Sequence, residues 1–334
     1  MGFITFGELM LRLTPEAHVG KLVDAGKFAV GYAGSESNVA TSLATLGNTV
    51  SYVSKLPQNP LGDAALHSLR RHGIATEYIV RGGQRLGTYF VELGMSIRPS
   101  RVVYDRRDSA FSGATIDEFD WVKIFTGASW LFVSGITPAL SDSCAAITVA
   151  MVSMARQMGV HVAFDFNYRR SLWEDPTQAK TIFKRILEHT DLVLGNVGVL
   201  ADIYGWRFDD TGHAQTQAAM IRFRDEFNIG KLAFTVRDHI SASHNRIAGV
   251  FLDGAESYSS DEYSIAVQDR FGTGDAFAAG ILHGVYNGWA AQKVVDFGAA
   301  AFALKHTLAG DLHLSNENEI LSIMAGNTAG HVIR

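Results

Sequence analysis

The sequence has one cysteine, Cys144, among its 334 residues. Intrachain disulfides and cysteine-rich zinc sites are therefore excluded, and a reducing compartment is expected. No stretch approaches about 18 uncharged apolar residues, so no membrane-spanning helix or cleaved leader is predicted. Basic residues are not in excess, because the net charge is −5 and no long basic run occurs. We therefore expect a cytoplasmic protein that binds neither membranes nor nucleic acids.

What the sequence does contain is an alternation of short apolar runs and helix-compatible segments. Charged residues make up 19% and hydrophobic residues 47%, as in ordinary globular proteins. The pattern predicts strands at 3–9, 49–55, 130–136, 161–166, 191–196 and 231–236, and helices at 37–47, 62–73, 141–159 and 176–190. Such alternation predicts an α/β fold with a mostly parallel sheet and helices on both faces. Ligands of these sheets bind beyond the carboxyl ends of the strands.

Two segments interrupt the alternation. Residues 12–34 and 83–112 contain extended pieces separated by glycine and proline, which predicts strands and turns outside the main sheet. No linker, repeat or low-complexity tract separates parts of the chain. We therefore expect one α/β domain over residues 1–334, with a small β lid formed by these two excursions.

Near the C-terminus the sequence "GTGD", Gly272 to Asp275, precedes a helix-like run. Glycines let backbone N–H groups turn in one direction, and a helix N-terminus adds partial positive charge, so Gly272, Thr273 and Gly274 could cradle an anion. Asp275 at its lip could accept a proton from an attacking hydroxyl in phosphoryl transfer. On these residues alone, a capped helix without a ligand is the more common outcome. The P-loop, protein-kinase, zincin and dinucleotide motifs are absent.

Three further glycines follow this motif at four-residue spacing, at 280, 284 and 288. Residues four apart lie on one face of a helix. The spacing therefore predicts a helix face that packs closely against a neighbour.

The segment "DRFGTGD" (269–275) resembles the D-x-x-G-A-G-D signature of the PfkB, or ribokinase-like, family of carbohydrate kinases, with Thr273 in place of alanine. "GSESNVA" (34–40) resembles the family's second signature, G-x-x-x-N-x-A, and two motifs this far apart are more specific than either alone. The resemblance extends over essentially the whole chain. It implies a ribokinase-like three-layer α/β sandwich with a small β lid, with ATP and Mg²⁺ as cofactors.

Within this family the segments at 98–112 and 165–173 resemble those of 2-keto-3-deoxygluconate kinases. The resemblance implies substrate-binding roles for the residues Gly34, Ser35, Asn38, Tyr89, Tyr104, Arg106, Arg169, Asp275 and Asp311. It implies catalytic roles for Asp275 and for the cradle residues Gly272, Thr273 and Gly274.

The two arginines can also be argued from their chemistry. A keto-acid carries a carboxylate, and a guanidinium group binds carboxylates through two parallel hydrogen bonds. Arg169 follows the strand predicted at 161–166 and so lies at a carboxyl end, where ligands bind. Arg106 lies in an arginine-rich segment, where a solvated surface charge is the alternative interpretation.

The nucleotide site is expected farther along the chain. The resemblance implies cofactor-binding roles for Asn167, Asn196, Thr235, Arg237, Gly272, Gly274, Ala303 and His306. Asn196 could equally cap the helix that follows it. The family usually reads N-x-x-E from this asparagine, whereas here the fourth residue is Val199, so a residue that helps to organise Mg²⁺ is missing. No residue is assigned as a metal ligand.

The resemblance implies ATP-dependent phosphorylation of 2-dehydro-3-deoxy-D-gluconate at its 6-hydroxyl, giving 2-dehydro-3-deoxy-6-phosphogluconate. One alternative is a kinase for another sugar, such as fructose, ribose or a related keto-acid. The other is a weakened protein that binds sugar acids or nucleotides, an alternative motivated by Val199. Exposed strand edges in the lid need covering, so a homo-oligomer is expected.

Overall fold

The computed structural model describes residues 2–16, 20–173 and 175–330. Its main sheet has the order β13-β12-β11-β10-β9-β8-β1-β4-β5, with β14 paired to β12. These strands are β1 (Phe3–Phe6), β4 (Val50–Leu56), β5 (Ile79–Arg81), β8 (Trp130–Ser134), β9 (His161–Asp165), β10 (Leu192–Gly195), β11 (Lys231–Ser241), β12 (His244–Asp253), β13 (Glu256–Ser259) and β14 (Tyr263–Ala266). The pairs from β5 to β11 are parallel, and those involving β12 are antiparallel.

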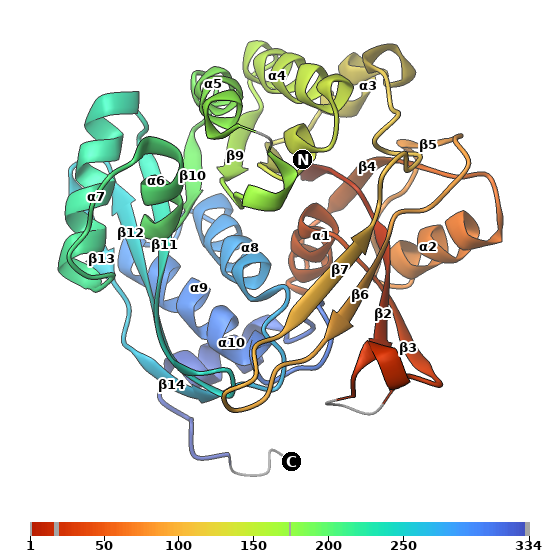
Figure 1. Cartoon of the computed structure of the whole chain (residues 1–334). Helices are drawn as coiled ribbons and strands as arrows, with labels where there is room; N and C mark the ends of the chain where they lie inside the picture. The colour runs from red at the N-terminus through yellow and green to blue at the C-terminus, as the bar shows by residue number, and fades with distance from the viewer. Residues whose placement is uncertain (1, 17–19, 174, 331–334) are drawn as a thin grey trace.

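Helices cover both faces of this sheet (Figure 1). They are α1 (Ser35–Thr45), α2 (Pro60–Arg70), α3 (Trp121–Phe125), α4 (Asp142–Gln157), α5 (Pro176–Leu187), α6 (Val197–Tyr204), α7 (His213–Phe227), α8 (Thr273–Tyr286), α9 (Ala291–Lys305) and α10 (Glu317–Met324). The predicted three-layer α/β fold is confirmed, as are all six predicted strands and all four predicted helices, with small shifts at their ends. None of the described helices has the length and apolarity needed to cross a membrane.

The layers follow from side-chain alternation along the central strands. On β8, Leu131 and Val133 pack into the core beneath α4 to α7, whereas Phe132 packs into the opposite core beneath α1, α8 and α9. Successive strand side chains point to opposite faces, so a strand covered on both sides must be apolar throughout. This is why the central strands read as continuous apolar runs. Their polar continuations begin only at the carboxyl ends.

A second sheet has the order β3-β2-β6-β7. Its strands are β2 (Met10–Pro15), β3 (Phe28–Ala33), β6 (Thr88–Glu92) and β7 (Arg101–Asp105). Both excursions contribute to it, although residues 17–19 of the first lie outside the described residues. That this sheet moves as a lid over a single domain stays a prediction.

The connection between β6 and β7 touches the far end of the β11–β12 hairpin (Figure 1). The amide of Ala242 donates to the carbonyl of Ser96 over 2.9 Å, and the amide of Ser96 donates to Ser243 Oγ over 2.8 Å. This contact joins the second sheet to the main sheet far from the start of the chain, where β1 leads into β2.

The glycine prediction needs one correction. Gly280 lies where an added Cβ would come within 2.9 Å of the Gly298 backbone in α9, and Gly284 is similarly close to Val294. Gly288 lies beyond α8, which ends at Tyr286, and its φ of 65° belongs to the turn that follows. Gly280 and Gly284 therefore provide the close packing of α8 on α9, and Gly288 provides a turn.

Candidate active site

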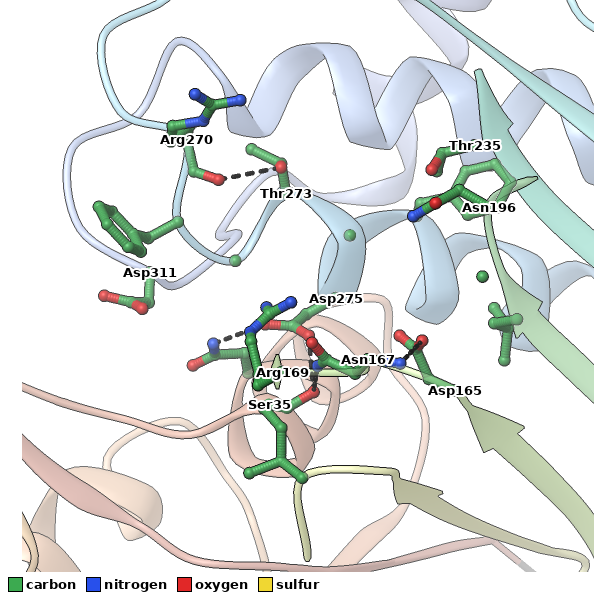
Figure 2. Close-up of a pocket in the computed structure, with 18 of the residues that line it drawn as sticks. Ser35, Asp165, Asn167, Arg169, Asn196, Thr235, Arg270, Thr273, Asp275 and Asp311 are labelled. Atoms are coloured by element: carbon green, nitrogen blue, oxygen red, sulfur yellow. Dashed lines mark hydrogen bonds between the residues drawn. The ribbon is translucent and has the colours of Figure 1, made fainter. Parts of the chain in front are cut away.

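A cavity of about 570 Å³ opens beyond the carboxyl ends of β1, β9, β10 and β11, beside the start of α8. Many of the predicted site residues meet there, and Figure 2 shows several of them around Asp275. Of the predicted set, those lining the cavity are Ser35, Asn38, Tyr89, Tyr104, Arg106, Asn167, Arg169, Asn196, Thr235, Arg237, Gly272, Thr273, Gly274, Asp275 and Asp311. The structure does not bring Gly34, Ala303 or His306 to the cavity surface.

The "GTGD" turn forms the start of α8. Gly272 has φ of 71°, and a Cβ there would lie 1.8 Å from the carbonyl oxygen of Asp311, so no other residue fits. Within α8 the first amide to find a helical partner is that of Ala276, which donates to Gly272 O over 3.0 Å. The amides before it are the free donors of a helix N-terminus, which attract anions. A Cβ at Gly274 would meet nothing within 4 Å, so glycine leaves open space there.

Asp275 lies at the centre of a polar network. Its Oδ1 accepts a hydrogen bond from Ser35 Oγ at 2.8 Å, and its Oδ2 accepts one from Asn38 Nδ2 at 2.7 Å. Burial raises the pKa of Asp275 to about 7, because it outweighs these two hydrogen bonds, and the charges of Asp165 and Asp311 raise it further. The sequence places Ser35 and Asn38 on one face of the first turn of α1, so the two signatures meet at this carboxylate.

The first acid of the same signature has a different role. Asp269 accepts from Arg12 Nη2 at 2.9 Å, from the amide of Gly310 at 2.9 Å and from the amide of Phe271 at 3.0 Å. Arg12, on β2, also pairs with Asp311. Asp269 therefore fixes the loop before α8 to the second sheet and does not line the cavity.

Asn167 connects β9 to this network. Its side-chain amide donates to Ser35 Oγ over 2.9 Å, and its backbone N–H donates to Asp165 Oδ1 over 3.0 Å. The backbone of Asn167 has a φ of 32°. Burial raises the pKa of Asp165 to about 6, against the opposing effects of the Asn167 amide and Arg169. The exposed guanidinium of Arg169 lies beside them (Figure 2). The carboxyl end of β9 thus supplies an acid, an amide and a cation to one wall.

The second sheet supplies the opposite wall. Arg106 Nε donates to Glu8 Oε2 over 2.8 Å, and its guanidinium carbon lies 5.6 Å from the centre of the Tyr104 ring. Tyr89 and Tyr104 are neighbours across β6 and β7, with ring centres 6.0 Å apart. Arg106 therefore reaches the cavity as half of a buried ion pair.

The remaining wall is formed by β10, β11 and the start of α6. Asn196 caps α6, because its Oδ1 accepts from the amide of Val199 at 3.1 Å, and it also lines the cavity. Arg237 Nη2 donates to Thr273 Oγ1 over 3.1 Å. His306 lies behind Arg237, where its Nδ1 is 2.7 Å from the carbonyl oxygen of Phe302. Phe302, one residue before the predicted Ala303, is the member of α9 that lines the cavity.

Sequence reasoning gave no individual site role to four residues that line the cavity, Glu8, Asp165, Arg270 and His239. Glu8 had a signal, because it is an acid next to the end of the strand predicted at 3–9, and Asp165 is an acid at the end of β9. Arg270 lies inside the recognised signature at a position where the family pattern allows any residue. His239 lies in the segment 235–243, which the resemblance assigns to the nucleotide, although only Thr235 and Arg237 were named within it.

Comparison with known proteins decides the family. A family model described as "pfkB family carbohydrate kinase" matches residues 3–222. The chain belongs to this family. The family, the ribokinase-like fold and the sugar-kinase class predicted from the two signatures are thereby confirmed.

Three full-length relatives of this PfkB kinase are informative. The 2-dehydro-3-deoxygalactonokinase of Haloferax volcanii is 33% identical over 98% of both chains. The 2-dehydro-3-deoxygluconokinase of Bacillus subtilis is 28% identical, over 98% of this chain and 97% of the relative. The crystal structure of 2-dehydro-3-deoxygluconokinase from Thermotoga maritima superimposes with a TM-score of 0.95 and 38% identity, covering 98% of this chain and 100% of that one.

Proposed function

We propose that this PfkB kinase transfers the γ-phosphoryl group of ATP to the 6-hydroxyl of 2-dehydro-3-deoxy-D-gluconate, giving 2-dehydro-3-deoxy-6-phosphogluconate and ADP. The observation that carries the proposal is the position of Asp275. It lies between a helix N-terminus suited to a phosphoryl group and a wall that presents Arg106 and Arg169, which suit a carboxylate. One cavity therefore contains groups that suit the phosphoryl end of a phosphorylated sugar acid and groups that suit its carboxylate end.

The reaction needs a base and charge stabilisation. Asp275 takes the proton of the 6-hydroxyl as that oxygen bonds to the γ-phosphorus, and the bond from phosphorus to the β,γ-bridging oxygen breaks to release ADP. A base is most effective when its pKa lies near the working pH, and the pKa of Asp275 is raised to about 7 by burial. Ser35 and Asn38 hold the carboxylate in place. The amides of the Gly272–Asp275 turn stabilise charge on the transferred group.

Mg²⁺ is proposed to arrive on the nucleotide. Among the described residues no three His, Cys, Asp or Glu side chains are grouped so that they could hold a metal ion. Val199 lines the cavity as an apolar side chain, and the acidic residues that line it are Glu8, Glu36, Asp165, Asp275 and Asp311. Because Mg²⁺ keeps several waters and binds mainly through substrate phosphates, this donor set fits a cation carried by ATP. When bound, it supplies positive charge to the phosphates.

The substrate assignment rests on the two arginines together with the acids named in the relatives. A related keto-acid is the second candidate, and a specific observation favours it. The Haloferax volcanii relative, which is more similar in sequence than the Bacillus subtilis one, acts on the galacto acid. A kinase for neutral sugars such as fructose or ribose would not need Arg106 and Arg169 at the cavity wall.

A substrate panel tests the proposal. ADP release is measured with 2-dehydro-3-deoxygluconate, its galacto epimer, fructose and ribose, and turnover of an acid is expected to exceed that of both neutral sugars. Arg169→Ala should raise KM for the acid by about 10–100-fold, the value of a charge-assisted contact. Arg170→Ala is the matched control, because Arg170 is exposed and pairs with Asp202 outside the cavity. If no sugar causes ADP release although ATP binds measurably, the chain is a binding protein and not a kinase.

Asp275→Asn tests the mechanism. Loss of a general base should lower kcat by about 10²–10⁴-fold while leaving substrate binding nearly intact. An unchanged kcat would remove Asp275 from the reaction.

The predictions on organisation accompany this function. We propose that residues 1–334 act as one domain, that the second sheet closes as a lid to exclude water during transfer, and that copies of the chain associate through exposed strand edges. A single buried cysteine supports a cytoplasmic, reducing location.

A further inference from the structure

Two arginines stand beside the Gly272–Asp275 turn. Arg237 comes from β11 and Arg270 from the loop before α8, and both line the cavity. Thr273 links them, because its Oγ1 accepts from Arg237 Nη2 at 3.1 Å and donates to the carbonyl of Arg270 over 3.0 Å. Figure 2 shows Arg270 and Asp275 on opposite sides of Thr273. Arg270 therefore lies away from the proposed base, and Arg237 is connected to Arg270 through Thr273.

Neither arginine has an acidic partner. Within the described part of the chain, no carboxylate forms an ion pair with Arg237 or Arg270, whereas Arg12 and Arg106 are both paired. Arg237 instead lies with its guanidinium carbon 5.0 Å from the centre of the Phe302 ring. The same cavity is lined by the neutral residues Asn196, Val199, Thr211 and Thr235.

The surroundings disfavour the charged form of both arginines. Burial lowers the pKa of Arg237 to about 10, and the charge of Arg270 lowers it further. Burial also lowers the pKa of Arg270. His306, next to Arg237, has its pKa lowered to about 3 by burial and by Arg237, so it is neutral at physiological pH. Two desolvated guanidinium groups without a counter-ion are costly, and a bound anion would remove that cost.

We propose that Arg237 and Arg270 clamp the phosphates that leave with ADP, so that the protein itself supplies charge that an acid-held cation would otherwise supply. This proposal rests on the proposed function, because it takes the bound anion to be a nucleotide. It orders the cavity from Arg106 and Arg169 at the sugar acid, through the cradle at the transferred group, to this pair at the leaving group. It follows that nucleotide binding depends on these side chains more than on free Mg²⁺.

The order along the cavity separates this pair from the arginines of the sugar end. Arg106 reaches the cavity from β7 and pairs with Glu8, and Arg169 reaches it from the end of β9. Arg237 contacts Thr273, the first residue of α8, through its guanidinium group, and Arg270 contacts it through its backbone carbonyl. A ligand carboxylate bound by Arg106 or Arg169 therefore leaves the second pair available for phosphate.

Calorimetric binding of ADP and of adenosine tests the clamp, each in EDTA and each with Mg²⁺. Wild type should bind ADP in EDTA within about tenfold of its affinity in Mg²⁺. Arg237→Gln and Arg270→Gln should each weaken ADP binding in EDTA by about 10–100-fold and leave adenosine binding unchanged. Arg246→Gln is the matched control, because Arg246 is an exposed arginine on β12 outside the cavity, and it should bind ADP as wild type does.

Three outcomes would overturn the clamp: ADP affinity unchanged in both variants, an equal loss of adenosine binding, or a change confined to KM for the sugar acid. Arg270→Gln guards against a folding failure, because Arg270 is only partly buried, and thermal unfolding of each variant checks this. The proposed function can fail separately. If no sugar is phosphorylated but ADP binding falls in the variants as stated, the clamp stands and the kinase substrate is wrong.

Discussion

Asp275 makes the stability of the ligand-free protein depend on pH in a way that Asp275→Asn removes. Its pKa is raised from 3.8 to about 7 by burial, so the folded protein holds a proton that the unfolded chain releases near pH 4. A raised pKa of this kind contributes stability at low pH, which is lost as pH rises toward the folded value. Between these two pKa values the free energy of unfolding falls by about 1.4 kcal/mol per pH unit.

Between pH 5 and pH 8 this titration should remove roughly 2–3 kcal/mol from the free energy of unfolding, since the slope acts over the two units up to pH 7 and then levels off. Asp165, with its pKa near 6, adds a further loss that both proteins share. The difference between wild type and Asp275→Asn therefore reports the titration of Asp275 together with its interaction with Asp165.

The assay is urea unfolding of both ligand-free proteins at half-unit steps from pH 5 to pH 8. The stability of the variant relative to wild type should rise by roughly 2–3 kcal/mol across this range. Parallel curves for the two proteins would refute the reasoning, because they would show that Asp275 titrates alike in the folded and unfolded states. They would also remove the physical basis for an effective base at pH 7.

Other predictions concern the frame of the site. Gly272→Ala should destabilise the fold by more than about 1 kcal/mol, since φ is 71° and the new Cβ would meet Asp311 O, and urea unfolding measures this. Gly274→Ala should leave stability within about 1 kcal/mol but lower kcat/KM, because its Cβ enters open space in the cradle; equal loss of stability in both variants would contradict this. Arg12→Ala should cost about 3–5 kcal/mol by leaving Asp269 and Asp311 unpaired, and an unchanged melting curve would show the ion pairs to be unimportant.

The extent of sequence prediction can be seen at particular residues. The strands around Phe132 and Phe164 were predictable because doubly covered strands are apolar at every position. Asp275 was predictable because its signature is local and its partner signature is recognisable on its own. The antiparallel strands β12 to β14 were not predicted, because they mix polar and apolar residues and form by pairing at the edge of the sheet.

Partners distant in sequence were also beyond prediction. Arg106 contacts Glu8 across 98 residues, and Arg12 contacts Asp269 across 257. The sequence around a charged side chain does not identify its partner, since such a pair forms only when the chain folds. For this reason the sequence allowed Arg106 to be placed at the site, but it did not allow the ion pair of Arg106 with Glu8 to be predicted.

The contact between Ser96 and the β11–β12 hairpin bears on how ligands enter. Any motion that lifts the β6–β7 connection from the hairpin must break both of its hydrogen bonds, each worth about 0.5–1.5 kcal/mol net. The tethered arrangement is therefore favoured over a lifted one by roughly 5- to 150-fold before any ligand binds. Entry by that route is limited to a minority of molecules at any instant, so shortening this connection should change association rates before it changes the chemical step.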